Sequence, residues 1–240
     1  MSEAINIKTL KGFVIIKGKI EVLSGLHIGA GKETMEIGGL DQPIIKHPLT
    51  GEPYIPGSSL KGRMRALLEQ VVAIRREETL KDLAKGNPCH CGKSECYICK
   101  LFGVSGAADN ENGPTRLLVR DCRMTEEWKE RFRQGELPME VKFENKINRV
   151  TGVAEHPRPL ERVPAGVEFD MELVLRVYED DEPKKMLDYV AKGLKLISLD
   201  ALGGNGSRGC GQVRFKDLKV ESTGNIGEKL EMNLKSVSIP

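Results

Sequence analysis

The chain has 240 residues, of which 39% are hydrophobic and 30% are charged, and its formal net charge at pH 7 is +2. This composition is typical of a globular domain with a buried core. Its apolar runs fall short of the roughly 18 residues that a membrane span needs. The first residues, MSEAINIKTLKGF, lack the layout of a signal peptide, so we expect a cytoplasmic protein with no membrane partner. The small net charge neither favours nor excludes a nucleic-acid ligand.

Hydrophobic periodicity predicts the elements in chain order. Residues 14–22 alternate between apolar and charged side chains, which predicts a half-buried strand. A loop rich in Gly and Pro covers 24–57, and apolar residues at helical spacing over 60–71 predict a helix that Ser58 or Ser59 caps. The later predicted elements are an irregular insertion at 86–114, a strand at 117–119, a helix at 128–132, an extended arm at 141–150, a strand at 169–177, a helix at 186–197, a glycine-rich turn at 203–211 and a strand from 213.

Without its insertions, this order is β-α-β-β-α-β, an α+β plan of the ferredoxin-like type that RRM-type RNA binders also use. No linker divides the chain and no internal repeat is visible. We therefore expect a single domain over 1–240. Its large insertions are expected at about 24–57, at 77–114 and at 122–166, and loops of that length in a compact domain are usually functional or mobile.

The start of the predicted helix carries an unusual set of cations. Lys61, Arg63 and Arg65 lie in its first turns, where positive charge opposes the helix dipole. The arrangement favours an anion at the helix N-terminus, held by free backbone N–H groups and by the hydroxyls of Ser58 and Ser59. A phosphate is the anion we expect, and the alternative is an ordinary solvated helix start.

A second candidate site is the segment GGNGSRGCG at 203–211. Glycine lets the backbone approach a ligand closely and adopt positive φ angles, and the guanidinium of Arg208 suits phosphate. The segment is neither a Walker A loop nor a dinucleotide fingerprint, because a helix precedes it and a strand follows. The alternative is a helix C-cap with a tight turn, which needs fewer glycines than the five present here.

Cysteine is concentrated in PCHCGKSECYICK, where the candidate metal ligands are Cys89, His90, Cys91, Cys96 and Cys99. Thiolate and imidazole ligands suit tetrahedral zinc. Five candidates compete for four places, and adjacent residues such as His90 and Cys91 seldom both bind one ion. We expect a structural zinc site, and the alternative is a loop of free thiols.

Two further segments carry polar side chains whose role composition alone leaves open. The loop at 25–48 contains His27 and Asp41, which by themselves suit a hydrogen-bonding residue and a turn former. The extended segment at 142–163 is basic, and its cations, Lys146 and Arg149 among them, suit contacts to a nucleic-acid backbone as well as a solvated hairpin.

The motifs GLHIG, GGLDQP, IPGSSLKGRMR, CKLFG, FENKINRVTGVA and GGNGSRGCG stand in this order along nearly the whole chain. Together they resemble the RAMP family, and most closely the backbone subunit of type III-A CRISPR (Csm) interference complexes. The motif GSSLKG and the glycine-rich turn are shared widely among RAMP proteins, whereas the FENKINR stretch and the position of Asp41 favour the Csm branch.

The resemblance implies a function. Copies of such a subunit stack into a helical filament on the CRISPR RNA together with other Csm subunits, and an extended thumb, here near 147–157, kinks the duplex of guide and target RNA. Family catalysis rests on the aspartate that Asp41 matches, and it uses Mg²⁺ or another divalent metal to cleave target RNA. Guide contacts in the family match His27, Lys61, Arg63 and the turn Gly203, Gly204, Gly206, Ser207 and Arg208.

Three other functions stay open at this point. The chain resembles, less closely, the equivalent backbone subunit of a type III-B (Cmr) complex. A guide-RNA scaffold without nuclease activity would need the same RNA contacts but no Asp41 chemistry. A metal-independent, guide-processing endonuclease of the RAMP superfamily would act as a monomer or a dimer.

Overall fold

The computed structural model describes residues 8–31, 42–73, 77–104, 110–227 and 229–239. Its helices and strands in chain order are β1 (Leu10–Val22), β2 (Tyr54–Ile55), α1 (Gly57–Ala73), α2 (Glu77–Ala84), α3 (Tyr97–Phe102), β3 (Leu117–Val119), β4 (Cys122–Arg123), α4 (Glu126–Arg133), β5 (Glu140–Ile147), β6 (Ala154–Arg162), β7 (Glu168–Tyr178), α5 (Pro183–Leu199), the 3₁₀ turn η2 (Gly206–Arg208) and β8 (Val213–Gly224). Among the described residues, no helix is both long and apolar enough to cross a membrane.

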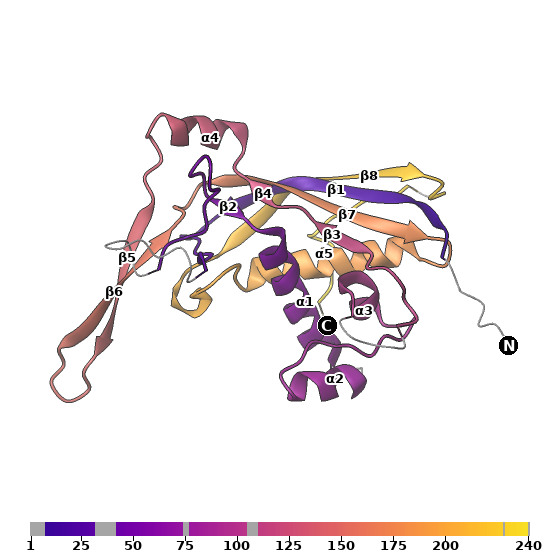
Figure 1. The fold of residues 1–240 in the computed structure, drawn as a ribbon, viewed down its shortest axis with the longest axis horizontal. Coiled ribbons are helices and arrows are strands. Elements are labelled where there is room, and N and C mark those ends of the chain that lie inside the picture. The colour runs from indigo at the N-terminus through magenta and orange to yellow at the C-terminus, as the bar shows by residue number, and fades with distance from the viewer. Residues whose placement is uncertain (1–7, 32–41, 74–76, 105–109, 228, 240) are drawn as a thin grey trace.

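A four-stranded antiparallel sheet in the order β3-β7-β1-β8 forms the centre of this mixed α/β fold. The helices α1 and α5 lie together on one face of it (Figure 1). The predicted alternation over 14–22 is confirmed, because Val14, Ile16 and Ile20 are buried while Lys17 is exposed. The alternation over 169–177 and the helical spacing over 186–197 are confirmed in the same way by β7 and α5.

The two helices pack unusually closely at Gly193 of α5. A Cβ atom at this position would lie 2.2 Å from Cγ of Met64 on α1. Such a contact is far inside van der Waals distance, so only glycine allows this approach. The close crossing fixes α1 against α5, and with it the start of α1, which carries the predicted phosphate-binding residues.

The opposite face of the sheet is covered by charges that pair across neighbouring strands. Lys17 of β1 lies 3.0 Å from Glu221 of β8, and Lys19 lies 3.4 Å from Glu168 of β7. Lys216 of β8 also pairs with Glu168. The positive charge of this face is therefore largely neutralised from within, which makes it a poor surface for a polyanion.

Two insertions leave the core in different ways. The hairpin of β5 and β6, called the thumb below, projects from one end of the sheet (Figure 1). Residues 85–104, called the metal loop below, lie beneath α1 and include α3. This loop was expected to be irregular, and the expectation is wrong for α3. All six of its residues are buried, so it lacks the apolar stripe by which a helix is predicted.

Candidate nucleic-acid interface and metal site

The N-terminus of α1 already has an anionic partner within the chain. The backbone N–H of Gly57 donates to Oδ1 of Asp121 at 2.7 Å. The prediction that Ser58 or Ser59 caps the helix is wrong, because α1 begins at Gly57 and both serines lie in its first turn. Ser58 is exposed and Ser59 is half-buried, so their hydroxyls remain close to the surface. No sequence pattern indicated this role for Asp121, which lies 64 residues further along the chain.

Lys61 and Arg63 use their charges to brace the fold. Nζ of Lys61 donates to the carbonyl of Leu117 on β3 at 2.9 Å. Burial, and after it the charge of Arg65, lowers the pKa of Lys61 below its usual value. Nε of Arg63 donates to the carbonyl of Ala201 at 2.9 Å, and its guanidinium pairs with Asp200 at 2.5 Å. Arg63 therefore ties α1 to the residues that lead into the glycine-rich turn.

The glycine-rich turn packs directly against His27. The backbone N–H of Gly204 donates to the carbonyl of His27 at 2.8 Å, and a Cβ atom on Gly203 (φ +79°) would lie 2.3 Å from the same oxygen. Nδ1 of the buried His27 donates in turn to the carbonyl of Glu161 on β6 at 2.8 Å. The positive φ and the close approach explain the need for glycine at 203.

The base of the thumb holds the other side of this turn. Nζ of Lys142 on β5 donates to the carbonyl of Arg208 at 2.6 Å, and Nε of Arg208 donates to Glu144 at 3.0 Å. The structure thus brings His27, the glycine-rich turn and the thumb base together. Gly206 and Ser207 lie in η2 at the surface, whereas Lys146 and Arg149 are exposed farther out along the thumb.

Asp41 lies outside the described residues, but the chain that follows it is firmly placed. Gln42 forms a bridge with Leu160 of β6, and the N–H of Glu161 donates to the carbonyl of Gln42 at 3.2 Å. The buried carboxylate of Glu161 accepts from the N–H of Ile44 at 3.0 Å and from Nζ of Lys46 at 2.6 Å. The segment from residue 42 is therefore fixed at the thumb base. Sequence reasoning missed Glu161, whose only signal is an acid next to apolar Leu160 in a strand.

Four cysteines of the metal loop converge. The Sγ atoms of Cys89, Cys91, Cys96 and Cys99 all lie within 4.8 Å of one another. The sulfur of Cys89 is 3.8 Å from Cys91, 3.9 Å from Cys96 and 3.7 Å from Cys99. A tetrahedral site with Zn–S bonds of about 2.3 Å has sulfur–sulfur edges of about 3.8 Å. The donor set and its spacing therefore fit zinc, and it is the one group of this kind among the described residues.

His90 takes no part in this cluster. Its side chain is half exposed, and Nδ1 lies 3.2 Å from the carbonyl of Pro88 and 3.3 Å from Asp82.

Hydrogen bonding to Cys89, and burial, raise the pKa of Cys96 to about 12. The thiol of Cys96 accordingly holds its proton when no cation is present, and a bound metal must displace it.

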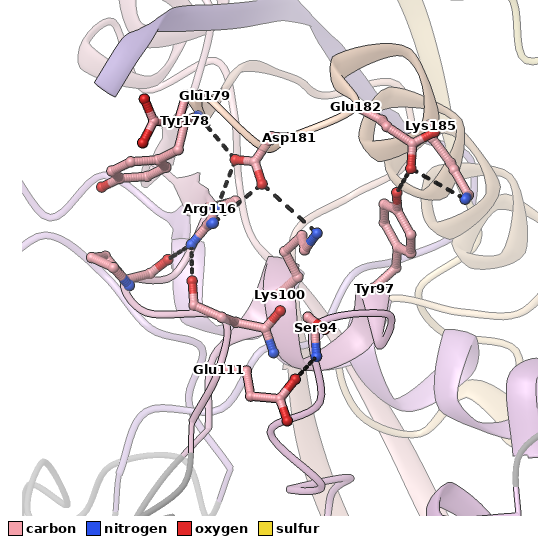
Figure 2. Close-up of polar contacts among 12 residues, drawn as sticks. Ser94, Tyr97, Lys100, Glu111, Arg116, Tyr178, Glu179, Asp181, Glu182 and Lys185 are labelled. Atoms are coloured by element: carbon pink, nitrogen blue, oxygen red, sulfur yellow. Dashed lines mark hydrogen bonds and ion pairs between the residues drawn. The ribbon is translucent and has the colours of Figure 1, made fainter. Parts of the chain in front are cut away.

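A buried network docks α3 of the metal loop onto the core (Figure 2). Arg116 is fully buried, and its guanidinium forms two hydrogen bonds to the buried carboxylate of Asp181, at 2.8 and 3.2 Å. It also donates to the carbonyls of Asn112 and Pro114. Nζ of Lys100 on α3 lies 3.8 Å from Asp181, so the acid joins β7 and α5 to the metal loop.

An aromatic contact reinforces this docking. The ring of Tyr97 stacks on Tyr189 of α5 with centroids 5.0 Å apart, and its hydroxyl donates to Glu182 at 2.6 Å. Burial, and then this hydrogen bond, raise the pKa of Tyr97. Figure 2 shows Lys185 reaching the same carboxylate. We refer to Arg116, Asp181, Lys100 and Tyr97 as the α3 clamp.

Comparison with known proteins identifies the relatives of the chain. Residues 19–214 match the RAMP superfamily. A protein of Methanothermobacter thermautotrophicus, called CRISPR system Cms endoribonuclease Csm3, is 44% identical over 221 residues, which cover 86% of this chain and 84% of that protein.

Solved structures agree. The crystal structure of Methanopyrus kandleri Csm3 is similar with a TM-score of 0.61 and 28% identity, over 88% of this chain and 78% of that one. A Csm3 chain in a Csm3–Csm4 subcomplex of the type III-A interference complex matches with a TM-score of 0.54 and 29% identity, over 90% of this chain and 82% of that one.

Proposed function

The chain belongs to the RAMP superfamily, in its Csm3 branch, and from this premise we propose how it binds and cleaves RNA as a backbone subunit of a type III-A complex. Guide RNA runs over the surface formed by His27, the glycine-rich turn, the start of α1 and the thumb base. The observation that carries this proposal is the convergence of these segments beside Gln42, the residue that follows Asp41. The opposite face of the sheet competes poorly for RNA, because its lysines are already paired with glutamates of the neighbouring strands.

The proposed function needs one domain, in which a common core carries three insertions. The element order β1, α1, β3, β7, α5, β8 and the sheet order β3-β7-β1-β8 support the proposal of a ferredoxin-like core. The three insertions at about 24–57, 77–114 and 122–166 then supply the Asp41 loop, the metal loop and the thumb. Backbone N–H groups of the turn and the hydroxyls of Ser58 and Ser59 bind phosphate oxygens. Lys61 and Arg63 act mainly by holding this surface in shape, and Lys146 and Arg149 reach the RNA directly.

Other chains complete the site. The exposed thumb apolar groups, including Val150 at 94% and Phe143 at 63% exposure, are suited to contact the RNA duplex or the next subunit. Copies of the chain stack along the guide RNA, and a Csm4-type subunit joins the stack, as in the subcomplex described above.

In the cleavage step, the carboxylate of Asp41 takes the proton from a 2′-OH of the target RNA. The 2′-oxygen then attacks the adjacent phosphorus, the bond from phosphorus to the 5′-oxygen breaks, and that oxygen leaves with a proton from water. The products are a 2′,3′-cyclic phosphate and a 5′-OH. A divalent ion such as Mg²⁺, bound by Asp41 and phosphate oxygens, would stabilise the negative charge of the transition state. The zinc in the four-cysteine site is structural, since all four ligands come from the protein.

The test is an Asp41→Ala complex reconstituted with guide RNA and given labelled complementary target in Mg²⁺ or in EDTA. Loss of a general base lowers the rate by about 10²- to 10⁴-fold. We therefore expect the cleavage rate of Asp41→Ala to fall at least about 100-fold while its affinity for the target RNA is unchanged. Asp180→Ala, at an exposed acid in the turn after β7, is the control and should cleave normally. Normal cleavage by Asp41→Ala would instead leave a non-catalytic guide scaffold as the better description.

A further inference from the structure

Helix α1 connects the candidate RNA surface to the metal loop through two of its own side chains. Arg65 lies one turn after Lys61, and Glu69 lies one turn after Arg65. Nε of Arg65 donates to Oε1 of Glu69 at 2.8 Å. Nη2 of Arg65 donates to the carbonyl of Cys89 at 2.6 Å, and the N–H of Cys89 donates back to Glu69 at 3.0 Å. Both backbone polar groups of this cysteine are therefore held by α1.

This ring of hydrogen bonds is largely buried. The side chain of Glu69 is 4% exposed and that of Arg65 is 19% exposed. A buried acid that loses its partners is costly, so the ring resists partial opening. Because the backbone of Cys89 sets the direction of its thiol, α1 determines where this sulfur lies relative to Cys91, Cys96 and Cys99. Groups that orient a ligand from outside in this way tune how well the metal is held.

The remaining ligands are fixed from another direction. Cys96 precedes α3 and Cys99 lies in it, and the α3 clamp docks this helix onto β7 and α5. A metal ion bound by Cys89, Cys96 and Cys99 would therefore link the cysteine that α1 holds to the helix α3. Without the ion, Arg65 and Glu69 still hold Cys89 to α1, but its sulfur meets those of Cys96 and Cys99 through weak thiol contacts.

The same ring controls charge at the start of α1. Glu69 neutralises Arg65, and Arg65 is the largest charged influence on Lys61 after burial. Lys61 in turn holds β3 through the carbonyl of Leu117. A displacement of Arg65 therefore changes the electrostatic environment of Lys61, one helical turn away, among the residues that form the candidate RNA surface.

We propose that Arg65 and Glu69 couple the four-cysteine centre to the start of α1, so that an occupied centre raises the affinity of the chain for guide RNA. The inference rests on the proposed RNA-binding function. By linkage, bound RNA strengthens metal retention by the same factor. Couplings of this kind are typically about 5- to 150-fold, which filter binding resolves easily.

The experiment measures binding of a single-stranded RNA to the full chain, zinc-loaded and zinc-stripped, for the wild type and for Glu69→Leu and Glu69→Gln. Glu69→Leu removes the acceptor of the Cys89 N–H, whereas Glu69→Gln keeps an acceptor oxygen and loses only the charge. Glu77→Gln, at an exposed ion pair in α2, is the control. We expect stripping to weaken RNA binding by the wild type at least about fivefold. Loaded Glu69→Leu should bind RNA as weakly as the stripped wild type, and Glu69→Gln should recover most of the loss.

A second readout follows the metal directly. In the cobalt-loaded protein, the thiolate absorption bands should change with Glu69→Leu and with added RNA, which a general loss of stability would not produce. Equal RNA affinity of the loaded and stripped wild type overturns the coupling. Where stripping unfolds the wild type, as judged by circular dichroism, equal RNA affinity of loaded Glu69→Leu and loaded wild type overturns it instead. If the loaded wild type binds no RNA at all, the proposed function itself fails.

Discussion

The metal loop and the thumb are both long insertions in one core, yet they differ in almost every physical respect. The metal loop is attached to α1 by the hydrogen bonds of Cys89, to Asp181 by Lys100 and to α5 by the stacking of Tyr97 on Tyr189, and its helix α3 is wholly buried. The thumb is a two-stranded hairpin that meets the core only at its base, and Val150 near its tip is 94% exposed. An isolated hairpin of two strands is only marginally stable in water.

The difference separates an insertion that serves the fold from one that serves a partner. The buried ion pair of Lys100 and the clustered thiols make the metal loop sensitive to the loss of a single side chain. The tip of the thumb is built from its own short-range bonds, since Oδ1 of Asn148 accepts from the N–H groups of Val150 and Thr151 at 2.9 and 3.1 Å. Its outward side chains therefore tolerate change, and substitutions there should alter binding and leave stability nearly constant.

Removal of a zinc ligand should produce the largest effect. The wild type should contain one tightly bound zinc ion per chain, and Cys99→Ser should lose it, because Cys99 is buried among the other three sulfurs. Structural zinc in small fingers contributes about 10–16 kcal/mol of apparent binding free energy, and here that energy orders the metal loop. Elemental analysis of protein purified without chelator measures the zinc content.

The neighbouring residue supplies the control. His90→Ala should keep its zinc, because the imidazole bonds to Pro88 and Asp82 instead of joining the four sulfurs. Zinc loss in His90→Ala, or wild-type protein without zinc, would contradict the four-cysteine assignment.

Loss of the α3 clamp should have the second-largest effect, on the stability of the chain. Arg116→Leu leaves the buried carboxylate of Asp181 without its main partner and removes the donor to two carbonyls. Breaking a buried pair from one side costs about 3–5 kcal/mol, so the urea unfolding midpoint of the zinc-loaded chain should fall clearly. Arg120→Leu is a matched control, since its pair with Glu172 is exposed and is worth about 0–1 kcal/mol. Equal midpoints for the two variants would show that the clamp is not a stabilising element.

Local patterns predicted the core of this protein well. The strands β1 and β7 and the helix α5 follow from periodicity, because each has one buried and one solvated face. The thiol spacing predicted a zinc site, and the sulfurs of Cys89, Cys91, Cys96 and Cys99 do lie close together, while binding of zinc there stays a prediction. The helix α3 was not predicted, because it is buried on all sides and its residues show no hydrophobic periodicity that distinguishes a helix from a loop.

The site was predicted less completely, for a reason that concerns distance along the chain. Lys61 and Arg63 were recognised by charge, but the direction of each side chain depends on the carbonyls of Leu117 and Ala201, 56 and 138 residues away. The roles of Asp121 and Glu161 likewise exist only through long-range partners. A sequence pattern indicates which residues carry charge, whereas the fold decides whether that charge faces a ligand or another part of the chain.

The thumb should show the smallest effect on stability together with a clear effect on binding. Lys146→Ala combined with Arg149→Ala removes two exposed cations, and exposed substitutions of this kind usually change stability by within about 0.5 kcal/mol. Each lost contact to a single-stranded phosphate lowers the slope of log affinity against log salt by about 0.7. The double variant should therefore reduce the salt slope for guide RNA by up to about 1.4, as measured by filter binding over a salt series.

A double variant on the self-neutralised face of the sheet removes the same charge elsewhere. Lys17→Ala with Lys219→Ala takes away two lysines that face each other across β1 and β8. Its salt slope should match the wild type, because the proposed path of the RNA does not cross that face. If the sheet variant lowers the slope and the thumb variant does not, the path of the RNA lies over the sheet, as in an RRM, and the thumb has no part in binding the guide. A lower slope in both variants would mean that only the total charge of the protein matters. In that case the double variant Lys229→Ala and Lys235→Ala, which removes two exposed lysines elsewhere, would lower the salt slope as well.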